Sequence, residues 1–296
     1  MILVTGGTGF VGGHIVRQLR IEGRPVRCLV RNVDKAGGLA NLGVELVEGD
    51  VADAECLGRA TEGCEVVVHL VAIRQGQQEE FDRVMTGGTV DLVAAAQVAG
   101  VQRFVLMSAL GTGEENKDLV PYYRAKWEME QTVTASGLQH VIFRPSFIFE
   151  RDGGILPTFA RLVRLAPVTP VIGAGTKRIQ PIWAGDMAAY FAAAIDHPDA
   201  ANRTFELGGP DVVTWNEFWE HLRRAVGVRR RPTIHVPVGL MRVNALVTER
   251  LPGDIPLTQD LLTMLERVDN VVTNDDAVRT FGLPLVPLDE QLRRAA

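Results

Sequence analysis

The sequence predicts an α/β protein: a Rossmann-type, doubly wound parallel sheet with a smaller, mostly helical C-terminal lobe. Two observations lead to this prediction. Through the first half of the 296 residues, short runs rich in Val, Ile and Leu alternate with longer amphipathic stretches, and a glycine-rich turn follows the first run. Such alternation favours a parallel sheet, because each right-handed crossover needs a helix to cover the sheet.

Six apolar runs in the first half are predicted to be buried strands. They lack strict alternation with polar residues, which is typical of parallel strands covered on both faces. The runs cover residues 2–5, 25–31, 44–48, 65–71, 101–108 and 139–144. Between the first two runs, an apolar stripe that includes Phe10, Ile15 and Leu19 predicts a helix.

Glycines and prolines break the second half into shorter pieces. A helix is predicted over 186–195 and a strand over 203–207, and Thr214 is expected to cap a further helix. Two more helices are predicted over 237–251 and 258–268. We therefore expect a dinucleotide-binding domain at 1–150, to which 179–207 returns. The segments 151–178 and 208–296 are expected to form a smaller substrate or partner lobe.

Composition argues against several classes of function. With 31 basic and 36 acidic residues, the net charge of −5 argues against a broad polyanion-binding surface, so no nucleic-acid partner is expected. The three cysteines form no CxxC pair and the six histidines show no ligand spacing, so no metal site is predicted. Free cysteines without a disulfide framework fit a reducing cytoplasm. The chain has neither a signal-peptide pattern nor an apolar run of the ~18 residues that a membrane span needs.

The stretch 236–251 carries an apolar face that would suit either a protein core or a membrane surface. Its charged residues are only Arg242, Glu249 and Arg250, whereas membrane-surface helices are usually rich in charge. A core-facing helix is therefore the favoured interpretation, and membrane association is not expected.

The glycine-rich turn predicts a nucleotide site. Gly6, Gly9 and Gly12 follow the first strand and open the first helix at a spacing that has a mechanical reason. The first glycine permits a tight turn, the second lets the backbone approach a pyrophosphate, and the third lets the helix pack close to the sheet. The N–H groups of the helix N-terminus would then face the phosphates. Among the residues between these glycines, we also expect Thr8, Phe10 and Val11 to line the cofactor.

The end of the second strand predicts which nucleotide binds. An acidic residue there would hydrogen-bond the ribose 2′-hydroxyl, whereas an arginine accommodates a 2′-phosphate. Here the strand ends at Arg31, and no acidic residue follows until Asp34. A guanidinium can bind phosphate through two hydrogen bonds, so NADP(H) is predicted in preference to NAD(H).

Two further segments lie at strand ends along the same predicted edge. Asp50 and Val51 follow the third strand, where a carboxylate can accept a hydrogen bond from the adenine amino group. Leu70, Val71 and Ala72 end the fourth strand, where the backbone can line the cofactor. Ligands of open α/β sheets bind at the carboxyl ends of the strands, so these residues are expected to join the site.

Five motifs in a fixed order carry a family resemblance. They are TGGTGFVG at 5–12, GDV at 49–51, HLVA at 69–72, YxxxK at 122–126 and RPS at 144–146. In this order they resemble the short-chain dehydrogenase/reductase superfamily, most closely its extended and atypical branch of NAD-dependent epimerases and NmrA-like proteins. Within that branch, the runs 104–111, 121–126 and 207–210 are similar to bacterial relatives of the NADPH-binding accessory subunit of respiratory complex I.

The resemblance implies a catalytic pair made of Tyr122 and Lys126. On a helix this spacing puts both side chains on one face. A nearby ammonium lowers the pKa of a tyrosine, which can then exchange a proton with a substrate oxygen. The same lysine can bond the nicotinamide ribose. A surface pair with Tyr123 as the buried member is the alternative reading of this helix.

Two departures from the family pattern concern the reaction site. The family's active serine usually lies one or two residues beyond Ser108, where this chain has Ala109 and Leu110. Ser108 would either help catalysis or satisfy a strand-end backbone group. The asparagine expected on the helix after the fourth strand is Met85 here. Fewer preorganised donors would then face a substrate oxyanion.

Pro145 and Phe147 follow the sixth strand, beside the expected nicotinamide position. Phe147 would pack either on the nicotinamide ring or in the core.

Two functions remain open at this point. One is an NADP(H)-dependent oxidoreductase or epimerase-like enzyme, acting on a small carbonyl or quinone-like substrate. The other is a non-catalytic NADPH-binding accessory or redox-sensing protein that offers its C-terminal lobe to a protein partner.

Overall fold

The computed structural model describes residues 1–73, 75–229, 231–249, 258–272 and 274–296. The chain forms two compact units. The first comprises Met1–Pro145, Ala184–Leu207 and Asp275–Pro284, and the second comprises Ser146–Trp183, Gly208–Asn274 and Leu285–Ala296.

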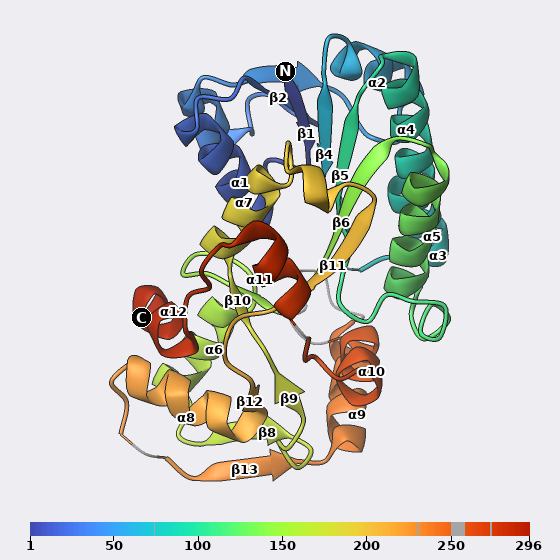
Figure 1. Cartoon of the computed structure of the whole chain (residues 1–296). Helices are drawn as coiled ribbons and strands as arrows, with labels where there is room; N and C mark the ends of the chain where they lie inside the picture. The colour runs from blue at the N-terminus through green and yellow to red at the C-terminus, as the bar shows by residue number, and fades with distance from the viewer. Residues whose placement is uncertain (74, 230, 250–257, 273) are drawn as a thin grey trace. The chain divides into compact units, whose positions relative to one another are not determined.

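The first unit is built on a seven-stranded parallel sheet in the order β11-β6-β5-β4-β1-β2-β3 (Figure 1). The interior strand β1 pairs with β2 and β4, so that Val4 lies opposite both Cys28 and Val68. The fold class predicted from the sequence, a Rossmann-type parallel sheet, is confirmed. The strands are β1 Ile2–Thr5, β2 Val26–Val30, β3 Glu45–Glu48, β4 Val66–His69, β5 Arg103–Met107, β6 Gln139–Pro145 and β11 Arg203–Leu207.

The six apolar runs of the first half all form strands of this sheet. Central strands are buried along their whole length, as in β1 and β4, because helices cover both faces of the sheet. At the edge, β3 exposes Glu45 and Glu48. The predicted strand 203–207 is β11, which pairs in parallel with β6 and forms the other edge.

Helices lie on both faces of this sheet. In Figure 1, α2, α4 and α5 cover one face, whereas α1 and α7 lie on the other. The predicted helix 186–195 is α7, which begins two residues earlier and has Asp186 in its first turn, where the helix dipole favours a carboxylate. The helices of this unit are α1 Phe10–Ile21, η1 Gly37–Leu42, α2 Ala54–Thr61, α3 Gln78–Phe81, η2 Asp82–Gly87, α4 Gly88–Val98, α5 Pro121–Ala135, α7 Ala184–Ala193, η3 Pro198–Ala200 and α11 Asp275–Phe281.

In the part of the chain that the structure describes, the second unit combines helices with three two-stranded sheets. Its strand pairs are β7 Ile148–Phe149 with β10 Ile182–Trp183, β9 Arg178–Ile179 with β12 Val213–Thr214, and β8 Thr169–Ile172 with β13 Thr233–Val236. Its helices are α6 Leu156–Leu165, α8 Trp215–Ala225, α9 Val238–Thr248, α10 Gln259–Arg267 and α12 Leu288–Ala295. An aromatic cluster that includes Phe149, Phe159 and Phe218 forms its core.

Thr214 caps α8 as predicted. Its hydroxyl accepts a hydrogen bond from the Glu217 backbone N–H, and the Glu217 carboxylate accepts one from the Thr214 N–H. This reciprocal capping box fixes where the helix begins.

The predicted helix 237–251 corresponds to α9, and the end of that prediction lies outside the described residues. Leu240, Val243 and Leu246 of this helix are each at least half exposed. The expectation that this apolar face turns to the core is therefore wrong at these three positions. No helix in the part of the chain that the structure describes is long and apolar enough to cross a bilayer.

Candidate functional site

The glycine-rich turn between β1 and α1 has little room for a side chain at Gly6 or Gly12. Gly6 has a φ of 77°, and a Cβ there would lie 3.1 Å from the Leu70 carbonyl carbon and from the Val71 nitrogen. A Cβ on Gly12 would overlap the Gly6 carbonyl oxygen. These two glycines therefore allow the tight turn and the close approach of α1 to the sheet.

The N-terminus of α1 is open for a ligand. Gly9 is the N-cap, and as a glycine it has no side chain to cap the first turn. The Gly9 N–H donates to the Gly6 carbonyl at 3.0 Å, and Thr8 and Gly9 are exposed. The first-turn N–H groups, including those of Phe10 and Val11, have no acceptor within their own helix. An uncapped helix N-terminus behind a glycine cradle fits the diphosphate of a dinucleotide.

Arg31 and Asp50 stand where their strands end. Arg31 directly follows β2 and is exposed. Asp50 lies two residues beyond β3 and is half-buried, and its carboxylate accepts the Ala52 N–H at 3.0 Å. The neighbouring Val51 is buried. Both strands are parallel to β1, so these residues lie at the same edge of the sheet as the glycine turn.

The residues after β4 reach the same edge. The Leu70 N–H donates to the Thr5 carbonyl at 3.1 Å, which holds its backbone against the glycine turn. Leu70 is buried, Val71 is half-buried and Ala72 is exposed. Their side chains thus pass progressively from the core to the surface.

A buried network lies beneath this edge. The His69 ring contacts the hydroxyls of Thr5 at 2.6 Å and Thr89 at 3.1 Å, and Thr89 donates to the Met85 carbonyl at 2.6 Å. Because the Thr89 proton is used there, Nε2 of His69 is assigned as the donor to Thr89, and Nδ1 accepts from Thr5. Burial, with Lys126 nearby, lowers the pKa of His69 to about 3, so the ring is neutral.

The predicted pair lies on α5, which begins at Pro121. Tyr122 is half-buried, and Nζ of Lys126 lies 5.9 Å from the centroid of its ring. Lys126 is buried, and its Nζ donates a 2.7 Å hydrogen bond to the Met107 carbonyl at the end of β5. Burial lowers the pKa of Lys126 to about 7, against the raising effect of Glu130.

Tyr123 has a different environment from its neighbour. It is buried, and its hydroxyl donates to the Leu110 carbonyl at 3.2 Å. Burial raises the pKa of Tyr123, so this phenol stays protonated. Tyr123 is therefore the buried tyrosine of α5, but Lys126 is buried as well, which the surface-pair reading did not anticipate.

An ion pair joins α5 to β6 one helical turn beyond Lys126. Glu130 accepts hydrogen bonds from Nε and Nη2 of Arg144 on β6, at 2.9 and 2.6 Å. The Glu130 side chain is only 4% exposed. Sequence analysis missed this pair, although the four-residue spacing from Lys126 to Glu130 was a usable signal.

At the first departure from the family pattern, Ala109 is half-buried and Leu110 is buried, as is the neighbouring Ser108. The Ser108 hydroxyl donates to the Thr112 hydroxyl at 3.3 Å, and its N–H donates to the Phe143 carbonyl at 2.7 Å. Met85 is fully buried in η2, a π-helical segment that the sequence did not predict. The Met85 side chain offers no strong hydrogen-bond donor where the family carries an amide.

The residues after β6 fall in different units. Pro145 is buried at the end of β6, and its carbonyl accepts a hydrogen bond from the Leu110 N–H at 3.0 Å. Phe147 belongs to the second unit, where its ring packs edge-on against Trp215 with centroids 5.8 Å apart.

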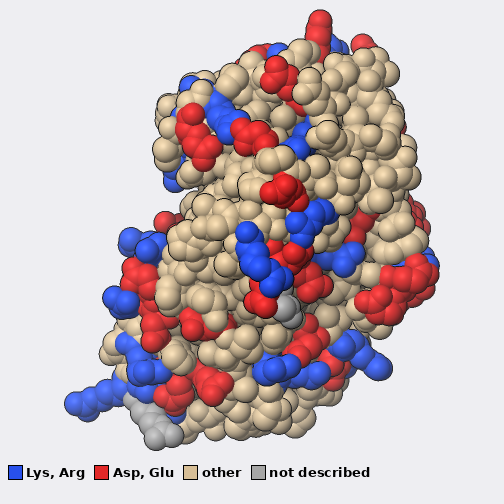
Figure 2. Space-filling model, in the orientation of Figure 1, with Lys and Arg blue, Asp and Glu red and all other residues tan. Residues whose placement is uncertain are grey.

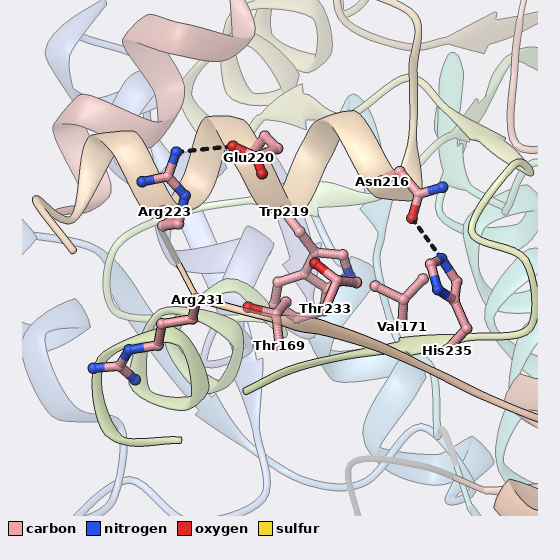
Figure 3. A pocket seen from close by; sticks show the side chains of 9 residues that line it. All are labelled: Thr169, Val171, Asn216, Trp219, Glu220, Arg223, Arg231, Thr233 and His235. Carbon is pink, nitrogen blue, oxygen red and sulfur yellow. Dashed lines mark hydrogen bonds and ion pairs between the residues drawn. The ribbon is translucent and has the colours of Figure 1, made fainter. Parts of the chain in front are cut away.

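The second unit contains a pocket of its own (Figure 3). Asn216 accepts a hydrogen bond from the His235 ring at 3.2 Å, and Arg223 pairs with Glu220 at 2.8 Å. Its lining comes from β8, α8, β13 and the segment before β13, so no single sequence motif predicted it. The residues that line it are Thr169, Val171, Asn216, Trp219, Glu220, Arg223, Arg231, Thr233 and His235.

Charge is mixed on the face of the molecule drawn in Figure 2, where basic and acidic side chains are interspersed. Among the described residues, no group of three or more His, Cys, Asp or Glu side chains is arranged to hold a metal ion.

Comparisons with known proteins give the following matches. A family model described as NAD(P)H-binding matches residues 6–198. The chain is 32% identical over 250 residues to the ceramide reductase of Caulobacter vibrioides (strain NA1000 / CB15N), covering 83% of this chain and 77% of that protein. It is 29% identical over 307 residues to NADH dehydrogenase (ubiquinone) 1 alpha subcomplex subunit 9, mitochondrial, of Mus musculus, covering 98% and 79%.

A solved structure has the same fold. The NADPH-dependent quinone oxidoreductase QOR2 of Escherichia coli, complexed with NADPH, matches with a TM-score of 0.79 at 20% identity. The match covers 99% of this chain and 98% of that one.

Proposed function

Because this chain belongs to the NAD(P)H-binding family, as an extended short-chain dehydrogenase/reductase, we propose that it is a reductase that uses NADPH in preference to NADH. Its substrate class would be a small carbonyl or quinone-like compound. The cofactor would lie on Gly6, Gly9 and Gly12. The residues that follow β2, β3 and β4 at the same sheet edge, namely Arg31, Asp50, Val51 and 70–72, would surround it. Arg31 would bind the 2′-phosphate.

The observation that carries this proposal is the placement of Lys126 beside Tyr122. A buried ammonium within 5.9 Å of a half-buried phenol ring would favour the tyrosinate form in its neighbour. NADPH, when bound, supplies a hydride to the substrate carbon. Tyr122 would donate its phenolic proton to the substrate oxygen, and Lys126 would stabilise the tyrosinate until it regains a proton from water.

Tyr122→Phe tests this role, with Tyr123→Phe as the matched control. We expect NADPH to bind both variants in calorimetry. Across a panel of carbonyl and quinone substrates, turnover should fall by at least about 100-fold only in Tyr122→Phe. Equal turnover of Tyr122→Phe and the wild type would contradict the acid/base role.

A second function has specific support, namely an NADPH-binding protein without turnover that contacts a protein partner. Met85 occupies the position of the family's amide, and the Ser108 hydroxyl is bonded to Thr112. Tight NADPH binding would stabilise such a protein without chemistry. NADPH binding with no turnover on the whole panel would favour this function over the reductase.

A further inference from the structure

One face of α5 connects Lys126 to a pair of charges that the proposed reaction does not use. Tyr122, Lys126 and Glu130 are spaced four residues apart on α5, so they share a face. Both Lys126 and Glu130 are buried, whereas Tyr122 is half-buried at the start of the row. The row therefore leads from the proposed acid into the interior of the first unit.

The Glu130 carboxylate is committed to Arg144. Both of its oxygens accept hydrogen bonds from the guanidinium, which is the bidentate arrangement that fixes the position of both groups. Lys126 instead donates to the Met107 carbonyl, an uncharged acceptor. The Glu130 carboxylate, which acts electrostatically on Lys126 from one helical turn along α5, is thus itself compensated by the Arg144 guanidinium.

We propose that Glu130 and Arg144 are positioning residues that set the charge of Lys126. The Glu130 carboxylate favours the ammonium form, and the Arg144 guanidinium limits that effect by compensating the carboxylate. The proposal rests on the function proposed above, because it matters to turnover only if Lys126 serves Tyr122.

The other groups around Lys126 do not replace this control. His69 on β4 faces Lys126 but is neutral, because its pKa lies far below 7. From α5 itself, Tyr122 and Glu130 face the ammonium, and β5 contributes the Met107 carbonyl. From β6 Arg144 acts through Glu130, and Glu206 and Glu115 lie near the Arg144 guanidinium.

The test measures the protonation of Lys126 directly. The chain contains four lysines, so protein labelled with 13C-lysine gives few Cε signals, and Lys126→Met identifies the one to follow. The titration midpoint of this signal is recorded for the full chain without cofactor or substrate. A failure of the reductase function therefore leaves this measurement intact.

The two single variants should move the midpoint in opposite directions. Glu130→Gln removes the negative charge, so the midpoint should fall by about one pH unit, a tenfold change in the protonation ratio. Arg144→Met leaves the carboxylate uncompensated, so the midpoint should rise by a similar amount. Arg144→Lys restores a positive charge and should return the midpoint toward the wild-type value.

Opposite shifts with rescue by Arg144→Lys would support the proposal. Equal midpoints in all the proteins, or shifts of the same sign in both single variants, would overturn it, since loosened packing acts on Lys126 in one direction. Should Arg144→Met not fold, Glu130→Gln and Arg144→Lys still decide the question. The proposal then requires that the titration midpoint of Lys126 falls in Glu130→Gln and stays near the wild-type value in Arg144→Lys.

Discussion

Nζ of Lys126 donates a 2.7 Å hydrogen bond to the carbonyl oxygen of Met107, the last residue of β5. This bond joins the proposed catalytic helix to the carboxyl edge of the sheet, where ligands of this fold class bind. It also makes the lysine part of the interior, and the consequences of that burial can be measured.

Burial of Lys126 should give the protein a pH-dependent stability near neutral and alkaline pH. Its folded pKa of about 7 lies below the usual 10.5, so between these values the unfolded chain binds more protons. The free energy of unfolding should therefore rise with pH across this window through this group, by about 5 kcal/mol at most. Urea unfolding from pH 6.5 to 9.5 should show a steeper rise for the wild type than for Lys126→Met, and parallel curves would contradict this.

The neutral ring of His69 predicts that the stability of the fold also depends on pH below neutrality. Its pKa falls from 6.5 in the unfolded chain to about 3 in the folded protein. The stability that this group contributes is present above pH 6.5 and lost as the pH falls toward 3, by about 5 kcal/mol at most. His69→Gln should lose less stability than the wild type between pH 6.5 and 4 in urea unfolding. The same loss in both proteins would mean that the buried ring does not titrate in this way.

Two adjacent glycines of α1 offer a matched pair of substitutions. In Gly12→Ala the new methyl overlaps the Gly6 carbonyl oxygen. We therefore expect the free energy of unfolding to fall by about 2 kcal/mol or more, and NADPH binding to weaken at least tenfold. In Gly13→Ala the nearest atom to the new methyl is the Gly7 carbonyl oxygen at 3.9 Å. This control should bind NADPH as the wild type does. Its free energy of unfolding should rise by up to about 1 kcal/mol, because alanine has a higher helix propensity than glycine. Thermal unfolding and calorimetry separate the two, and similar behaviour would refute the packing argument.

The cofactor preference depends on Arg31. A charge-assisted contact with the 2′-phosphate is worth about 1.5 to 3 kcal/mol, so Arg31→Ala should weaken NADPH binding by about 10- to 100-fold. NADH binding should change little. Arg59→Ala, which removes an exposed arginine from the last turn of α2, is the control and should leave both affinities unchanged. Comparable affinities for the two cofactors in the wild type would exclude the preference.

The sequence predicted the sheet well because its strands are buried on both faces. A run such as 66–69 is apolar at all but its last position, and only a covered parallel strand explains this economically. The three small sheets of the second unit were not predicted. Pairs such as β7 with β10 are two residues long, which is too short for any periodicity to appear.

Parts of the candidate site were also beyond sequence reasoning. The spacing of Tyr122 and Lys126 predicted that they share a helix face, but charged residues are rarely buried, so the burial of Lys126 and of the Glu130–Arg144 pair was not foreseen. The π-helical turn that holds Met85 depends on packing against α4 and α5, which no local pattern reveals.

The division of the chain limits how this protein can be dissected. The chain passes between the two units five times, at 145/146, 183/184, 207/208, 274/275 and 284/285. A fragment that ends at residue 145 would lack β11 and α7, leaving β6 as an unpaired edge and one sheet face partly bare. Open edges and uncovered apolar faces promote aggregation. Truncation at that point should therefore yield insoluble material.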